Sequence, residues 1–150
     1  MRGPKTLLLL AAMAFATGTG TLRADLKGAL NERDLGKRSK LALDNASAAL
    51  KAAREAYQKG DSAGLAAAAN EIQESVDLVW DSLQSTGKNP RNSPKWFKQA
   101  EIGTRVLLKK LDTLQHDLGF EERPVLDKAK AQVQKVHDDL LIGLMEGKHK

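Results

Sequence analysis

The sequence predicts an all-α protein, an up-down-up-down four-helix bundle made of two helical hairpins that follow an N-terminal signal peptide. Long segments carry apolar residues at alternating spacings of three and four, which is the period of one face of a helix. Glycine and proline residues separate these segments, and apolar and polar residues never alternate for long enough to indicate a β-strand.

Residues 1–16 have the pattern of a secretory signal peptide. A start that carries Arg2 and Lys5 is followed by an apolar run over residues 7–16. This run is shorter than a membrane-spanning helix, which needs about 20 apolar residues. Cleavage after Ala16 would remove two positive charges, so the formal net charge would fall from +5 to +3.

Beyond the signal peptide, the sequence divides into a linker and one domain. Gly20 and Ala24 are alternative cleavage sites, and residues 17–36 are expected to form a linker or a short helix. Residues 37–150 can bury a single core and are assigned to the bundle. The chain contains no cysteine, which excludes a lipoprotein anchor and disulfide bonds. Export without disulfides is common among bacterial periplasmic proteins, so we predict a secreted or periplasmic bacterial protein.

The first hairpin is expected to consist of helices from about Lys37 to Lys59 and from Ala63 to about Ser85. Gly60 ends the first of them, and Asp61 or Ser62 caps the second. The residues expected in the core are Leu43, Ala46, Leu50, Ala53, Tyr57, Leu65, Ala69, Ile72, Val76, Val79, Trp80 and Leu83. The acidic residues expected on the outer side of the second helix are Glu71, Glu74, Asp77 and Asp81.

A hinge rich in glycine, proline and positive charge, residues 86–100, separates the two hairpins. Gly87 is expected to end the preceding helix in a left-handed conformation, and Pro90 keeps the chain from re-entering a helix. Ser93 and Pro94 then start the next helix, with the serine as its cap and the proline at its first position.

The second hairpin is expected to consist of a helix from Pro94 to about Leu118 and a helix that starts between Glu122 and Pro124, with Gly119 between them. The residues expected in its core are Phe97, Ala100, Thr104, Leu107, Leu108, Leu111, Leu114, Leu126, Ala129, Val133, Val136, Leu140 and Leu144.

Positive charge gathers in the hinge and along the outer side of the third helix, with Ile102 among the cations. We call this surface the basic face; its candidate binding residues are Lys88, Arg91, Lys95, Trp96, Lys98, Arg105 and Lys109. It would suit an anionic envelope surface or an acidic protein face, including the acidic helix of a second copy in a weak homo-oligomer. The other interpretation is a solvated bundle exterior whose aromatic residues fill the core.

We predict a non-catalytic interaction module without a cofactor. The chain has no cysteine that could serve as a nucleophile. Nucleic acid binding is disfavoured by export and by the small positive charge of the mature chain. An alternative is a small periplasmic metal or heme carrier that uses Asp112, His116 and His137, since the first two lie one helical turn apart.

Overall fold

The computed structural model of the protein describes the backbone of residues 20–147 and the side chains of residues 26–147. The predicted signal peptide, residues 1–16, lies outside the described residues. The helices are α1 (Gly20–Asn31), α2 (Leu35–Gln58), α3 (Ser62–Ser85), α4 (Lys95–Asp117), the short 3-10 helix η1 (Arg123–Leu126) and α5 (Asp127–Glu146). This part of the chain contains no strand, so the all-α prediction is confirmed.

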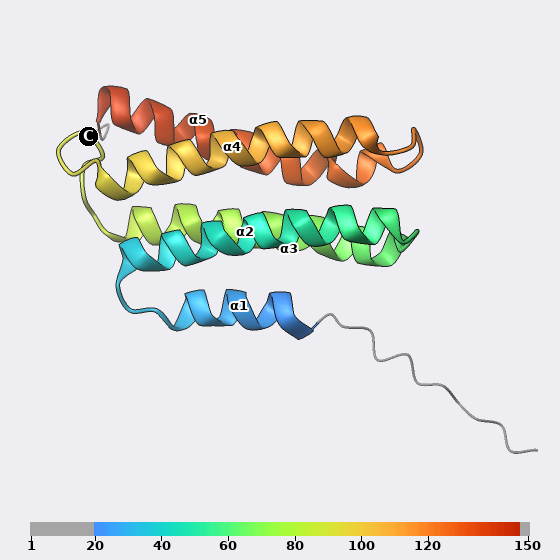
Figure 1. Ribbon diagram of the computed structural model, residues 1–150. Helices are drawn as coiled ribbons and strands as arrows, with labels where there is room; N and C mark the ends of the chain where they lie inside the picture. The colour runs from blue at the N-terminus through green and yellow to red at the C-terminus, as the bar shows by residue number, and fades with distance from the viewer. Residues whose placement is uncertain (1–19, 148–150) are drawn as a thin grey trace, which may run out of the picture.

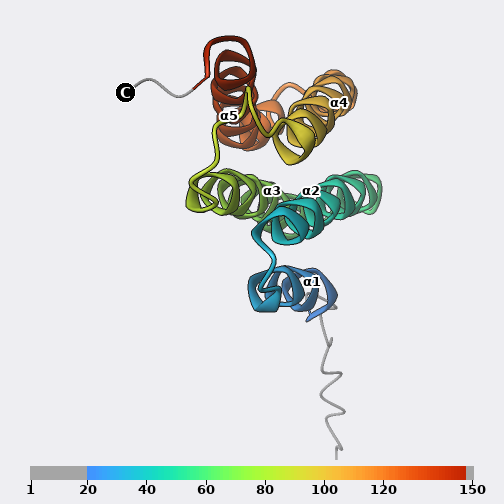
Figure 2. The same cartoon turned by 90° about the vertical axis from the view of Figure 1, so that its left-hand side faces the viewer.

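The helices form three layers (Figures 1 and 2). Helices α2 and α3 lie side by side and antiparallel in the middle layer, and α4 and α5 form an antiparallel pair on one side of them. Between the two hairpins, α2 packs against α4 and α3 packs against α5. The four main helices therefore pack as two antiparallel hairpins, as predicted. Helix α1 covers the opposite side of the middle layer.

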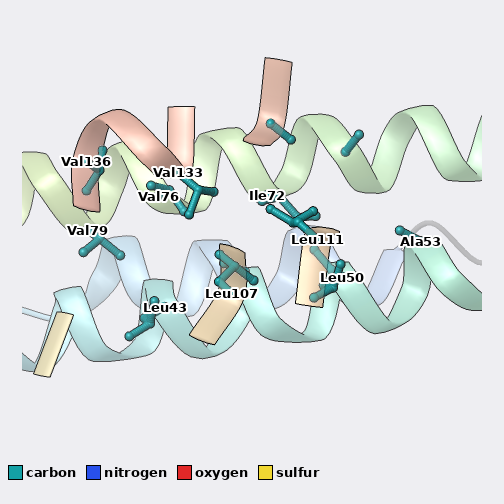
Figure 3. Packing of buried hydrophobic residues seen from close by; sticks show 14 of the residues in the cluster. Leu43, Leu50, Ala53, Ile72, Val76, Val79, Leu107, Leu111, Val133 and Val136 are labelled. Atoms are coloured by element: carbon teal, nitrogen blue, oxygen red, sulfur yellow. The ribbon is translucent and has the colours of Figure 1, made fainter. Parts of the chain in front are cut away.

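The core between the hairpins is built from the predicted apolar positions. Leu107 and Leu111 point from α4 toward Leu50 and Ile72 of the middle layer (Figure 3). The predicted positions are buried, except for four at the edge of the core that are only partly buried: Tyr57, Trp80, Leu108 and Leu144. Helix α4 approaches α2 closely at Gly103, where a Cβ atom would overlap the side chain of Leu43.

A second buried surface lies on the side of the first hairpin that was predicted to face solvent. The Asn45 side-chain amide donates to Glu71 Oε1 at 3.0 Å and to Ser75 Oγ at 2.8 Å, and the Ser75 hydroxyl donates to the Glu71 carbonyl oxygen at 2.7 Å. Glu71 is only 6% exposed. The prediction of an outer position for Glu71 is therefore wrong, because α1 and α2 pack against sides of α3 that the second hairpin does not cover.

The first two helix starts follow ordinary capping chemistry. The Asp34 carboxylate accepts from the Lys37 amide at 2.8 Å, so α2 begins at Leu35, slightly earlier than predicted. The Asp61 carboxylate accepts from the Gly64 amide at 2.8 Å, which confirms Asp61 as the cap of α3.

The hinge between the hairpins differs from the prediction at its end. Gly87 adopts a φ of 67°, which confirms its left-handed conformation after α3. Pro94 occupies the N-cap position of α4 and no side chain caps this helix, so the predicted serine cap is wrong. The Ser93 amide donates to the Asn89 carbonyl oxygen at 2.9 Å, which holds Ser93 in the turn of the hinge.

The last helix starts later than predicted. Residues 123–126, which include Pro124, form the 3-10 helix η1 in place of the first α-helical turn, and α5 begins only at Asp127.

Candidate functional site

The cations of the basic face all lie on the surface. Lys88 and Arg91 are exposed in the hinge, and the other four cations are exposed along α4: Lys95, Lys98, Arg105 and Lys109. At 100° per residue these four positions lie opposite Leu107 and Leu111, which face the core. The buried side of α4 therefore fixes which way its cations point.

Trp96 anchors the hinge end of this surface. Its side chain is partly buried, and its indole lies so close to Gly36 in the first turn of α2 that a Cβ atom there would overlap the ring. Lys95 Nζ lies 4.8 Å from the centre of the Trp96 ring, within the range of a cation–π interaction. A pocket of about 170 Å³ opens beside this pair, lined by Thr86, Lys88, Ser93, Pro94, Lys95, Trp96 and Phe97.

Most cations of the basic face have no acidic partner. Arg105 pairs with Glu101, its Nε atom 3.2 Å from Oε1 of the carboxylate. Lys95, Lys98 and Lys109 form no ion pair with any residue in the described part of the chain. Four of the Lys and Arg residues elsewhere do pair with a carboxylate, in the pairs Lys40–Asp44, Arg54–Asp117, Lys130–Asp112 and Lys135–Asp139. The charge of the basic face is thus available to an external anion.

Glu101, which lies on α4 between Lys98 and Arg105, is turned toward α5. Its Oε1 atom lies 3.2 Å from Nε2 of His137, and both side chains are mostly buried. The other ring nitrogen, Nδ1, lies 3.1 Å from Oδ1 of Asp138. Hydrogen bonds from His137 and then from Gln134 hold the pKa of Asp138 below its usual range. The contact of His137 with Glu101 joins α5 to α4, whereas its contact with Asp138 stays within α5.

The residues considered for a metal or heme site are not brought together. His116 Nδ1 lies 2.8 Å from the backbone oxygen of Asp112, whose carboxylate pairs instead with Lys130. His137 is engaged by Glu101 on the neighbouring helix. Among the described residues, no group of three or more histidine, aspartate and glutamate side chains could hold a metal ion.

Exposed apolar side chains lie beside the basic face, and most of them were not singled out by the sequence. Ile102 and Val106 of α4 are 45% and 47% exposed, and Met145 of α5 is 68% exposed. The signal was present in the sequence: at helical spacing, Ile102 and Val106 fall on the same side as the cations and outside the core stripe.

A wider apolar groove lies at the same end of the molecule. It has a volume of about 400 Å³ and is lined mainly by the end of α3, the hinge and the end of α5. Its apolar lining residues are Trp80, Pro90, Phe97, Leu140 and Ile142. Phe97 forms a wall of both hollows, so the hinge separates a cationic pocket from an apolar one.

Neither a protein-family model, nor a curated protein, nor a solved structure matches this chain. Within the part of the chain that the structure describes, no helix is both long enough and apolar enough to cross a membrane.

Proposed function

We propose that this protein is a non-catalytic interaction module of the bacterial cell envelope, an up-down-up-down bundle exported by its signal peptide, that binds anionic partners through the basic face. One observation carries the proposal. Lys95, Lys98 and Lys109 are exposed on one side of α4 and have no acidic partner in the described part of the chain.

The spacing of these cations favours a partner with many charges over a single small anion. Lys95 and Lys109 are 14 positions apart on one helix, which corresponds to about 21 Å at the helical rise per residue. A lone phosphate or carboxylate contacts only one end of such a row. A surface or polymer that repeats its negative charge can contact the whole row, and each contact displaces counterions.

The proposal is tested by replacing Lys95, Lys98, Arg105 and Lys109 together with glutamine. Binding to dextran sulfate, a soluble polyanion, is measured at low salt and at about 0.15 M salt, where the screening length is about 8 Å. We expect the natural chain to bind strongly at low salt and the variant to lose most of that binding.

A matched control removes the same number of positive charges elsewhere. Arg33, Lys37, Lys51 and Lys59 are exposed near α2 and can be changed together to glutamine. Circular dichroism is used to check that both variants are folded. Equal binding losses in the two variants would mean that net charge alone governs the interaction, and unchanged binding of the first variant would reject the basic face as a binding surface.

A further inference from the structure

We infer that the outer side of the α4–α5 layer docks onto the surface of an anionic lipid bilayer, with the cations of α4 at the headgroup phosphates and the neighbouring apolar side chains reaching below them. This inference rests on the proposed function and narrows its partner to a lipid surface. It is carried by the juxtaposition of unpaired cations and exposed apolar residues on one layer.

The exposed apolar residues are concentrated in the second hairpin. Six of the eight large apolar residues exposed in the described chain belong to α4, α5 or the loop between them: Ile102, Val106, Phe120, Leu141, Ile142 and Met145. Helix α2 contributes only Leu41 to this group, and α3 contributes none. Single exposed apolar residues are ordinary on any protein surface, but most of the large ones exposed in the described chain belong to this one layer.

On α4 the apolar and cationic side chains share one narrow strip. At 100° per residue, Ile102 falls within an arc of about 60° that also contains Lys98, Arg105 and Lys109. Lysine and arginine can extend their charged ends past a neighbouring apolar side chain, because their aliphatic stems are long. The strip therefore presents charge at its outer level and apolar surface between the stems, as interfacial membrane helices do.

Helix α5 continues this surface. Met145 lies opposite the buried Leu140 around the helix, and it therefore faces away from the middle layer. Figure 2 shows that no described helix covers the outer side of α4 and α5. Two neighbouring helices thus expose apolar side chains toward the same side.

The acids Glu101 and Asp138 do not pair with the lysines of the α4 strip. Glu101 is mostly buried against His137 and Arg105. Asp138 is 54% exposed but already accepts hydrogen bonds from Gln134 and His137 of its own helix. The positive charge is therefore local to the α4 strip, because residues 95–146 as a whole contain nine Lys and Arg residues and nine Asp and Glu residues.

A bilayer fits this combination better than a soluble polyanion does. A polyanion offers negative charge but no apolar phase, so it would leave Ile102 and Met145 in water. An anionic bilayer offers a negative headgroup layer directly above acyl chains, which matches charge beside apolar side chains. Binding to a bilayer should therefore depend on the apolar residues, whereas binding to a polyanion should not.

The first experiment measures cosedimentation of the full chain with vesicles of phosphatidylglycerol and phosphatidylcholine in equal parts. We compare Ile102→Gln combined with Met145→Gln against a control, Leu30→Gln combined with Leu41→Gln, whose positions are exposed in the other layers. We expect the first variant to bind vesicles at least tenfold more weakly, because a tenfold loss corresponds to about 1.4 kcal/mol, which is less than the full burial of one such side chain contributes. The control should bind as the natural chain does, and binding of all three to dextran sulfate should be equal.

The second experiment detects contact with the apolar phase directly. Because the chain has no cysteine, Ile102→Cys and Leu41→Cys each give a single site for an environment-sensitive fluorophore. We expect a blue shift with the same vesicles, and quenching by spin-labelled acyl chains, at position 102 but not at position 41. Both labelled chains are first checked for native circular dichroism.

The outcomes separate this inference from the proposed function. Vesicle binding that depends on both the cations and the apolar pair supports docking on a bilayer. Vesicle binding that depends on the cations alone, with no blue shift at position 102, overturns it in favour of purely electrostatic binding. Binding to dextran sulfate without vesicle binding overturns it too, yet leaves the proposed function standing, and failure to bind either probe overturns both.

Discussion

Replacing Gly36 by alanine tests whether the first turn of α2 holds Trp96 in place. Gly36 is buried, and a Cβ atom at this position would overlap three atoms of the Trp96 indole. A rigid ring cannot give way as the end of a flexible side chain can, so either the ring or the helix must move. Overpacking of this kind costs about 1 to 3 kcal/mol of unfolding free energy.

Helix propensity acts in the opposite direction. Alanine stabilises a helix relative to glycine by up to about 1 kcal/mol. Gly28 of α1 isolates this effect, because no atom lies within 4 Å of a Cβ atom built there. We therefore expect Gly28→Ala to raise the free energy of unfolding by up to about 1 kcal/mol, and Gly36→Ala to lower it by up to about 2 kcal/mol.

Urea denaturation followed by circular dichroism measures both effects. The chain has two tryptophans, so the same variants in a Trp80→Phe background report the environment of Trp96 by fluorescence. Gly36→Ala should shift the emission to longer wavelength as the indole leaves α2, and Gly28→Ala should not. The reasoning is refuted if Gly36→Ala stabilises the protein as Gly28→Ala does and leaves the emission unchanged.

Two further predictions concern the core and the pH dependence of stability. Leu111→Ala should lower the free energy of unfolding by about 2 to 5 kcal/mol, because Leu111 is fully buried between the hairpins. Leu108→Ala, at a partly buried position, should lower it less. If urea denaturation gives the same loss of unfolding free energy for both variants, the assignment of Leu111 to the core is contradicted. Hydrogen bonds from His137 and then Gln134 lower the pKa of Asp138 from its ordinary value of 3.8. The charged Asp138 carboxylate therefore stabilises the fold above pH 3.8, and this stabilisation is lost as the pH falls through the pKa of the folded state. Asp138→Asn should therefore lower the melting temperature slightly between about pH 5 and pH 7 but not below about pH 2, and a difference that stays constant with pH would exclude this contribution.

Local sequence patterns were sufficient for most of the fold. The core stripes of the four main helices follow a period that any single helix imposes on itself, and the buried positions agree with it. Asp61 and Gly87 were also predictable, because a side-chain cap and a left-handed glycine depend on a few neighbouring residues.

Features that depend on distant segments were not predictable. Glu71 is buried because α1 and α2 pack around α3, and nothing near Glu71 in the sequence indicates that another helix lies there. The contact of Trp96 with Gly36 likewise joins residues far apart in the chain. Sequence spacing placed the cations of α4 on the side away from the core, but it could not show that Lys98 and Lys109 lack acidic partners. The acids three positions beyond them on α4, Glu101 and Asp112, pair instead with His137 and Lys130 of α5.

The relative size of the electrostatic and apolar contributions decides how the outer side of the α4–α5 layer would bind a bilayer at physiological salt. The row from Lys95 to Lys109 spans about 21 Å, but its neighbouring cations are separated by only about 5 to 11 Å along the helix axis. These separations are close to the screening length of about 8 Å, so salt weakens the attraction of the row to headgroups without removing it. Physiological salt hardly changes the free energy gained by burying apolar side chains. Helix α4 is fixed on α2 at Trp96 and Gly103, so docking would order lysine side chains but not the backbone, which limits its entropic cost. The cations would therefore govern the approach to a bilayer and the orientation on it, whereas Ile102 and Met145 would govern how long the protein stays bound.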